Sequence, residues 1–106
     1  MVFKVKFSEQ ATDDLDGIIA YIEDELYNPQ AAERFYNLVN KKRALLREHP
    51  YMFPLCPDEK LRAEGYRSVV IGNFIMFYLV DDDKSVVNIA RILYRRRDIP
   101  SAFNES

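Results

Sequence analysis

The side chains in this sequence that are best suited to chemistry are arginines close to its end. Arg95, Arg96 and Arg97 stand side by side as the densest positive charge in the chain, and Arg91 and Arg67 precede them. A guanidinium group offers a planar fork of donors that fits phosphate and carboxylate oxygens. These arginines are therefore candidates to hold a phosphate backbone, an acidic peptide or a target protein. The alternative is that they are solvated, or that they pair with Asp13, Asp14 or Asp16.

Tyr94 lies directly before the arginine cluster. A phenol can act as a general acid or stack on a nucleobase, and the alternative is an aromatic side chain at the edge of the core. Because successive side chains of a strand point to opposite faces, Arg91, Leu93 and Arg95 should share one side, with Ile92 and Tyr94 on the other. Arg91 and Arg95 are thus expected to face the same way.

Three runs rich in β-branched and aromatic residues predict the strands that must position these side chains, at residues 66–70, 74–80 and 86–93. Gly72-Asn73 separates the first two runs and can supply the positive φ of a tight hairpin. A longer polar loop, residues 81–85, separates the second and third. The sequence therefore predicts a three-stranded antiparallel meander.

The N-terminal half predicts a strand and two helices. Residues 2–7 alternate between apolar side chains and lysines, as in a half-buried strand. Apolar residues at helical spacing predict a helix from about Glu9 to Leu26. Asn28-Pro29 is typical of a helix start, and the second helix should end at His49, before Pro50. Its expected core-facing residues are Ala32, Phe35, Tyr36, Val39, Leu45 and Leu46.

Gly17 interrupts the first predicted helix. A glycine inside a helix costs about 1 kcal/mol relative to alanine. Gly17 either permits a close helix crossing or is a tolerated surface glycine. Tyr21, one turn further on, is expected to pack between the helices, as is Tyr36.

These elements predict an α+β fold with the order β-α-α-β-β-β, in one domain spanning residues 1–106. The helical hairpin should pack on one face of the sheet, because it has no other large apolar surface to cover. The N-terminal strand should pair with one of the meander strands, which makes the sheet four-stranded.

Composition excludes several classes of function. The net charge is −2, which argues against a surface that binds nucleic acid as a whole. No apolar run is long enough to span a bilayer, the N-terminus lacks the apolar core of a signal peptide, and the single cysteine fits a reducing cytoplasm. With one histidine and no glycine-rich phosphate loop, no metal site or cofactor is expected.

Several segments, in order and spacing, resemble the RelE/ParE superfamily, the toxins of type II toxin–antitoxin systems, over nearly the whole chain. The matching segments are Ala11-x-x-Asp14-Leu15-x-x-Ile18-x-x-Tyr21-Ile22, Asn28-Pro29-x-Ala31-Ala32-x-x-Phe35, Leu46-x-x-x-Pro50, Gly65-Tyr66-Arg67, Phe77-Tyr78-x-Val80, and Val87-x-Ile89-x-Arg91 continuing to Asp98. The resemblance implies the fold described above. It also implies a growth-inhibiting toxin of the plasmid-stabilisation type, bound by a cognate antitoxin and able to pair with a second copy of itself.

The superfamily has two activities, and the resemblance can be followed to either. RelE-like members cut mRNA in the ribosomal A site, and ParE-like members poison DNA gyrase. Cutting RNA through its 2′-hydroxyl needs a base, a cation beside the phosphorane and an acid for the leaving oxygen. A metal-independent endonuclease would here use Arg67, Arg91, Tyr94 and one of the C-terminal arginines.

Nucleolytic members of the superfamily place an arginine on the central strand, where this chain has Ile75. That departure favours a ParE-like binding toxin with a gyrase-type target, contacted by Arg95, Arg96 and Arg97. The mRNA endonuclease stays as the alternative. A third reading is an interaction module that has lost its toxicity.

Overall fold

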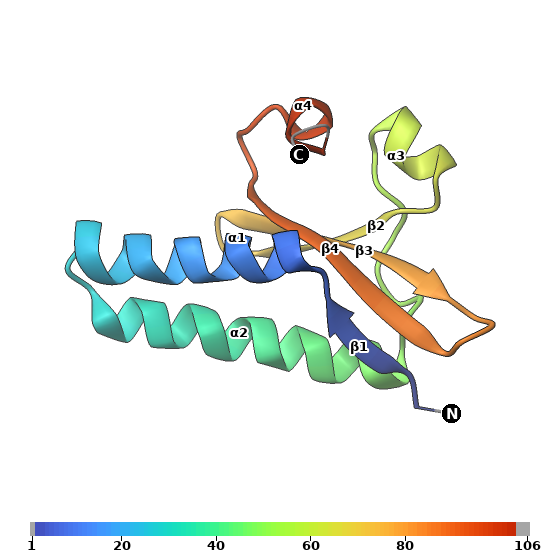
Figure 1. The fold of residues 1–106 in the computed structure, drawn as a ribbon, viewed down its shortest axis with the longest axis horizontal. Helices are drawn as coiled ribbons and strands as arrows, with labels where there is room; N and C mark the ends of the chain where they lie inside the picture. The colour runs from blue at the N-terminus through green and yellow to red at the C-terminus, as the bar shows by residue number, and fades with distance from the viewer. Residues whose placement is uncertain (1, 104–106) are drawn as a thin grey trace.

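The element order predicted from the sequence is confirmed in the computed structural model of the chain, which describes residues 2–103 (Figure 1). The expected fraying of residues 104–106 falls outside the described residues. The elements are β1 (Lys4–Phe7), α1 (Glu9–Ala20), the π-helix η1 (Tyr21–Glu25), α2 (Pro29–Glu48), α3 (Glu59–Ala63), β2 (Arg67–Ile71), β3 (Phe74–Asp81), β4 (Val86–Tyr94) and α4 (Ile99–Phe103).

The four strands form one mixed sheet in the order β1-β4-β3-β2. β2, β3 and β4 make the predicted antiparallel meander, and their ends lie within one residue of the predicted bounds. Gly72, between β2 and β3, has a φ of 60°, as a tight turn of this kind requires. β1 pairs with β4 in parallel, so the last meander strand lies inside the sheet. Arg91 and Tyr94 are therefore carried by a central strand.

Where β1 ends, the start of α1 covers the outer edge of β4. Ser8 caps α1 by accepting the Ala11 N–H at 3.0 Å, and its hydroxyl donates to the Ala90 carbonyl at 2.9 Å. Further along α1, the Asp14 carboxylate accepts the Ile92 N–H at 2.9 Å. Helix side chains thus satisfy strand groups that would otherwise form an open edge.

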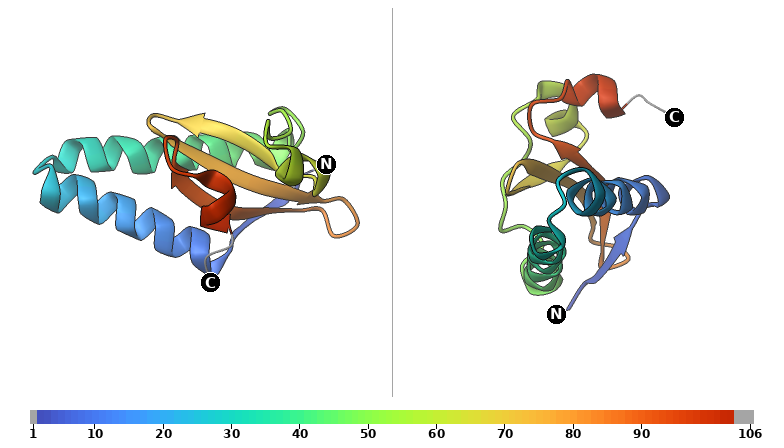
Figure 2. Two further views of the ribbon diagram at one scale, coloured as in Figure 1. Left: turned by 90° about the horizontal axis from the view of Figure 1, so that it is seen from above. Right: turned by 90° about the vertical axis from the view of Figure 1, so that its left-hand side faces the viewer.

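The helical hairpin covers one face of the sheet, as predicted (Figures 1 and 2). α2 buries a single stripe, formed by Ala32, Phe35, Val39 and Leu46. The predicted inward positions of Tyr36 and Leu45 are wrong, since these side chains are 50% and 36% exposed. Both side chains lie outside this stripe, on the part of α2 that faces solvent.

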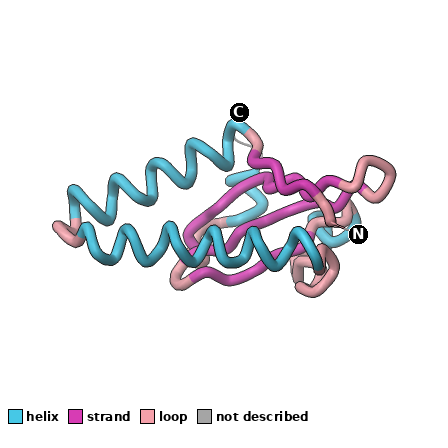
Figure 3. Tube along the Cα trace, turned by 90° about the horizontal axis from the view of Figure 1, so that it is seen from below, coloured by secondary structure: helices cyan, strands magenta, loops and turns pink. Residues whose placement is uncertain are grey.

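The first helix does not continue as an α-helix to Leu26. After Ala20 it widens into the π-helix η1, where the Leu26 N–H donates to the Tyr21 carbonyl at 3.2 Å. This wider turn buries Ile22 and leaves Tyr21 52% exposed, so the expected packing of Tyr21 between the helices is wrong. At this end the hairpin extends past the sheet (Figures 2 and 3).

Two short helices, α3 and α4, cover the opposite face of the sheet and enclose a second, smaller core. Phe77 and Leu93 point into it from the strands, together with the buried Cys56. Phe103 of α4 packs edge-on against Phe77, with ring centroids 5.2 Å apart. The two faces of the sheet therefore carry different cores. Arg67 and Arg91 lie on different faces, each on the side of one of these cores.

Candidate functional site

Arg91 is buried in an ion pair with Asp14. Its Nε donates to one carboxylate oxygen at 2.8 Å and a terminal nitrogen donates to the other at 3.1 Å. The other terminal nitrogen donates to the Ala102 carbonyl of α4 at 2.8 Å. The two side chains are only 9% and 15% exposed. Arg91 therefore joins α1, β4 and α4. Its pairing with Asp14 agrees with the alternative given in the sequence analysis, that the arginines pair with acidic residues of the first helix.

Arg67 holds the loop that follows α2. Its terminal nitrogen donates to the Phe53 carbonyl at 2.7 Å, and its guanidinium lies 4.9 Å from the centre of the Tyr51 ring. The Tyr51 hydroxyl in turn donates to Asp82. These contacts direct the Arg67 guanidinium toward the protein's own loop.

Arg67 and Arg91 point to opposite faces of the sheet. Arg67 stands opposite Tyr78, which belongs to the main core under the hairpin. Arg91 stands opposite Phe77, which belongs to the smaller core under α4. Paired residues of neighbouring strands share a face. The structure therefore does not bring these two candidate catalytic cations together.

Tyr94 and the C-terminal arginines are exposed at the end of β4. Tyr94 is 45% exposed and packs edge-on against Phe74, on the hairpin side, with ring centroids 5.8 Å apart. Arg95, Arg96 and Arg97 are exposed in the segment that follows. The predicted alternation is confirmed for the strand itself, because Ile92 lies in the main core and Leu93 in the smaller one.

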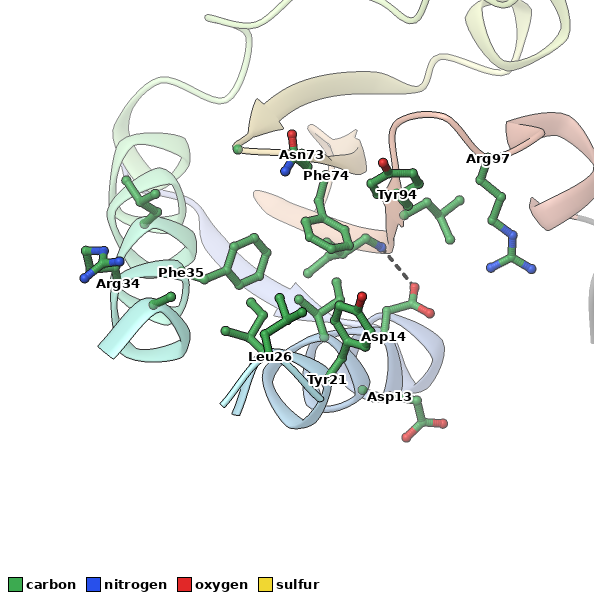
Figure 4. Close-up of a pocket in the computed structure, with 18 residues that line it drawn as sticks. Asp13, Asp14, Tyr21, Leu26, Arg34, Phe35, Asn73, Phe74, Tyr94 and Arg97 are labelled. Atoms are coloured by element: carbon green, nitrogen blue, oxygen red, sulfur yellow. Dashed lines mark hydrogen bonds between the residues drawn. The ribbon is translucent and has the colours of Figure 1, made fainter. Parts of the chain in front are cut away.

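A groove of about 940 Å³ lies between the overhanging hairpin and the end of the sheet (Figure 4). We call it the hairpin groove, and its lining residues include Gly17, Tyr21, Leu26, Phe35, Phe74 and Tyr94. It is largely apolar, with Arg34 and Arg97 among its polar lining residues. The hydrogen bond between Asp14 and Ile92, drawn in Figure 4, lies along its wall. A groove lined in this way suits a polypeptide segment with an apolar face.

Sequence reasoning missed this groove, because its walls come from segments far apart in the chain. Tyr21 is expected from the sequence to pack between the helices, and Leu26 is one of the apolar residues at helical spacing. Both are exposed instead, at the end of the hairpin that extends past the sheet. Gly17 was singled out, but no helix crosses it: a Cβ placed there would meet nothing within 4 Å. A glycine inside a helix is a signal in the sequence that could have drawn attention to this surface, but the sequence alone does not connect Gly17 with a groove.

Burial raises the pKa of the Tyr78 phenol to about 12. The side chain is fully buried, and its hydroxyl donates to the Pro50 carbonyl at 3.0 Å. Burial likewise raises the pKa of the Cys56 thiol. Both shifts favour the neutral form, so these groups contribute to packing and hydrogen bonding at neutral pH.

Within residues 2–103, no three His, Cys, Asp or Glu side chains are grouped so that they could hold a metal ion. No helix in the same range is long and apolar enough to cross a bilayer.

One family model matches the chain, over residues 5–99, and it describes the ParE toxin of the type II toxin–antitoxin system parDE. The chain belongs to this ParE toxin family. It is thus the toxin component of a type II toxin–antitoxin system, in agreement with the resemblance seen in the sequence. A comparison with curated protein sequences found no match.

Solved structures similar to this ParE-family toxin confirm its fold. A chromosomal ParDE system from P. aeruginosa matches with a TM-score of 0.69 and 20% identity, over 88% of this chain and 96% of that one. A RelBE toxin–antitoxin complex from Mycobacterium tuberculosis matches with a TM-score of 0.61 and 21% identity, over 90% of this chain and 100% of that one. A RelE–RelB complex from Pyrococcus horikoshii matches with a TM-score of 0.62 and 19% identity, over 92% of this chain and 99% of that one.

Proposed function

We propose that this ParE-family chain inhibits growth by binding a protein target of the DNA gyrase type, and that it does not cut RNA. The proposal rests chiefly on the placement of Arg67 and Arg91 on opposite faces of the sheet. Cleavage of a phosphodiester needs its cation and its proton donor around one phosphate, within hydrogen-bond reach. Two cations divided by a sheet cannot share such a site.

The neighbouring side chains also support a binding role. The Arg91 guanidinium donates to Asp14 and to the Ala102 carbonyl, so RNA would have to displace a buried ion pair to reach it. Ile75, at the position where nucleolytic relatives are expected to carry arginine, packs against the smaller core. Tyr94 faces the hairpin groove, on the other side from Arg91.

The surface proposed to contact the target is the exposed segment Arg95 to Arg97. A guanidinium group is more weakly hydrated than an ammonium group and forms two-pronged bonds to carboxylates, and arginine is enriched in protein–protein interfaces. These arginines follow the last buried residue of β4, Leu93, so a target can reach them without disturbing either core.

A supercoiling assay with purified components tests this target. The purified chain, added to DNA gyrase and relaxed plasmid, should inhibit supercoiling and increase the amount of cleaved DNA. A variant with Arg95, Arg96 and Arg97 all replaced by alanine serves as the matched control and should be inactive. Normal supercoiling by gyrase in the presence of an excess of the purified toxin would contradict a gyrase-type target.

We also propose that a cognate antitoxin silences the toxin by laying a helical or extended segment across the hairpin groove. The groove exposes apolar area that a partner can bury, and disordered tails commonly fold on such surfaces. The similar structures described above include toxin–antitoxin complexes, which supports a polypeptide partner for this fold. A partner that binds only the folded chain stabilises it by mass action, so co-expression should raise its melting temperature. Identical melting with and without the partner would contradict this.

A further inference from the structure

Gly17 is a glycine that the fold of the isolated chain does not need. It lies inside α1, away from either end, and its φ is not in the left-handed region where glycine is favoured. A Cβ at this position would meet no atom within 4 Å. Alanine would therefore fit without a clash and would favour the helix, since glycine inside a helix is unfavourable. Neither backbone conformation nor internal packing accounts for the glycine.

Gly17 lies in the wall of the hairpin groove. One helical turn earlier the wall is formed by Asp13 and Asp14, and one turn later by Tyr21. Because Gly17 has no side chain, and a Cβ there would meet no atom within 4 Å, the wall leaves open space between these neighbours, which we call the recess.

The recess is suited to an apolar group. The Asp14 carboxylate beside it is neutralised by Arg91 and also accepts the Ile92 N–H, so its charge is already compensated. The other groove residues near this level of α1 are Asp13, which is exposed to solvent, and the apolar Ile18 and Ile22. An apolar side chain entering the recess would lose no hydrogen bond and would leave no charge unpaired.

We propose that Gly17 determines the fit of the antitoxin, by leaving a recess in which the antitoxin segment seats one apolar side chain against α1. This inference rests on the proposed binding of an antitoxin in the hairpin groove. The glycine at position 17 would then serve binding, since the fold of the free toxin does not require it. In an interface of this kind, a small cavity filled by one side chain can carry much of the affinity.

The test uses Gly17→Ala and Gly17→Leu in the full chain, with the polypeptide encoded by the adjacent reading frame as the probe. Gly17→Ala should raise the melting temperature of the free toxin by about 4 °C, because the helix is favoured. The same variant should bind the probe about tenfold more weakly, and Gly17→Leu more than about a hundredfold, because the added atoms occupy the recess. Thr12→Leu is the matched control, since Thr12 is exposed on α1 and does not line the groove.

The outcomes separate the recess from the groove itself. If both Gly17 variants bind the probe like the wild type, Gly17 is a tolerated surface glycine and the recess has no role. If Gly17→Ala lowers the melting temperature, the glycine serves the fold and the inference is equally overturned. If the wild-type chain does not bind the probe, the antitoxin proposal fails and the recess fails with it. Equal losses for Thr12→Leu and Gly17→Leu would also overturn the inference, because the loss would then come from leucine anywhere on α1 and not from a filled recess.

Discussion

Arg91 on β4 and Asp14 on α1 form a two-pronged ion pair, with nitrogen–oxygen distances of 2.8 and 3.1 Å. Asp14 also accepts the Ile92 N–H, and Arg91 also donates to the Ala102 carbonyl of α4. The pair therefore links an N-terminal helix, a central strand and the last helix described. Its geometry is that of a structural ion pair, and it withdraws Arg91 from the surface that a nucleic acid could reach.

Removing either partner of this pair should destabilise the fold. Asp14→Ala and Arg91→Ala should each lower the free energy of unfolding by about 3 kcal/mol, because each leaves a buried charge without its partner. Toxicity on induction should fall together with stability for Arg91→Ala. Urea unfolding of the purified variants measures the change.

The double variant Asp14→Ala with Arg91→Ala provides the control. It leaves neither charge buried, so its loss of stability should be clearly smaller than the sum of the two single losses. Additive losses, or single losses below about 1 kcal/mol, would mean that the pair is only a surface contact.

Stability should fall at high pH because of Tyr78. Its pKa is about 12 in the folded chain and about 10 in the unfolded chain, so the folded state keeps a proton that the unfolded state releases. The contribution is fully present below pH 10 and is lost as the pH rises through 12, by about 3 kcal/mol in all, since each pKa unit corresponds to about 1.4 kcal/mol. Urea unfolding at a series of pH values measures it. Tyr78→Phe should reduce this dependence, leaving the part that comes from the raised pKa values of Tyr51 and Tyr66. An unchanged slope in that variant would assign the effect to other groups.

Antitoxin binding should depend on Leu26 and not on its neighbour. Leu26 lines the hairpin groove, whereas Tyr27 is 86% exposed and does not line it. Leu26→Asp should weaken antitoxin binding at least about tenfold, because a carboxylate would be buried without a partner. Tyr27→Asp adds the same charge one residue further on, at a φ of 49° that aspartate tolerates well, and should bind normally. Calorimetric titration would show the contrast, and equal affinities would argue against the groove.

Replacing Arg95, Arg96 and Arg97 together with alanine should abolish toxicity and leave the fold intact. Their side chains are exposed, and each exposed substitution changes the free energy of unfolding by no more than about 0.5 kcal/mol. Growth on induction and the melting temperature of the purified variant are the two measurements. A triple variant that stays fully toxic would place the target-binding surface elsewhere, with the helical hairpin as the next candidate.

Local signals were sufficient for most of the fold. The strand bounds followed from the β-branched runs and the Gly72 turn, and the start of α2 from Asn28-Pro29, whose asparagine oxygen accepts the Ala31 N–H at 3.0 Å. The pairing of β1 was not predictable, because side-chain alternation does not say which strand lies alongside. The π-helix after Ala20 was not predictable either, since apolar spacing looks similar for both helix types.

The placement of the candidate site residues was harder to predict than the fold. The alternation of side chains along β4 correctly predicted that Ile92 and Leu93 point to opposite faces of the sheet. The ion pair between Arg91 and Asp14 forms because α1 covers the edge of β4, and this contact joins residues far apart in the sequence. The orientation of Arg67 depends likewise on the loop at Tyr51 to Phe53 folding back over it. Sequence patterns report periodicity within an element, and these contacts form between elements.

We propose that this toxin acts by binding a gyrase-type target and not by cutting RNA. The most direct measurement is to induce the chain in growing cells and follow DNA synthesis, protein synthesis and mRNA integrity together over the first minutes. We expect replication to stop first, with DNA cleaved in covalent complexes with gyrase, while ribosome-bound mRNA stays intact. Rapid loss of protein synthesis with cut mRNA, before replication slows, would contradict it.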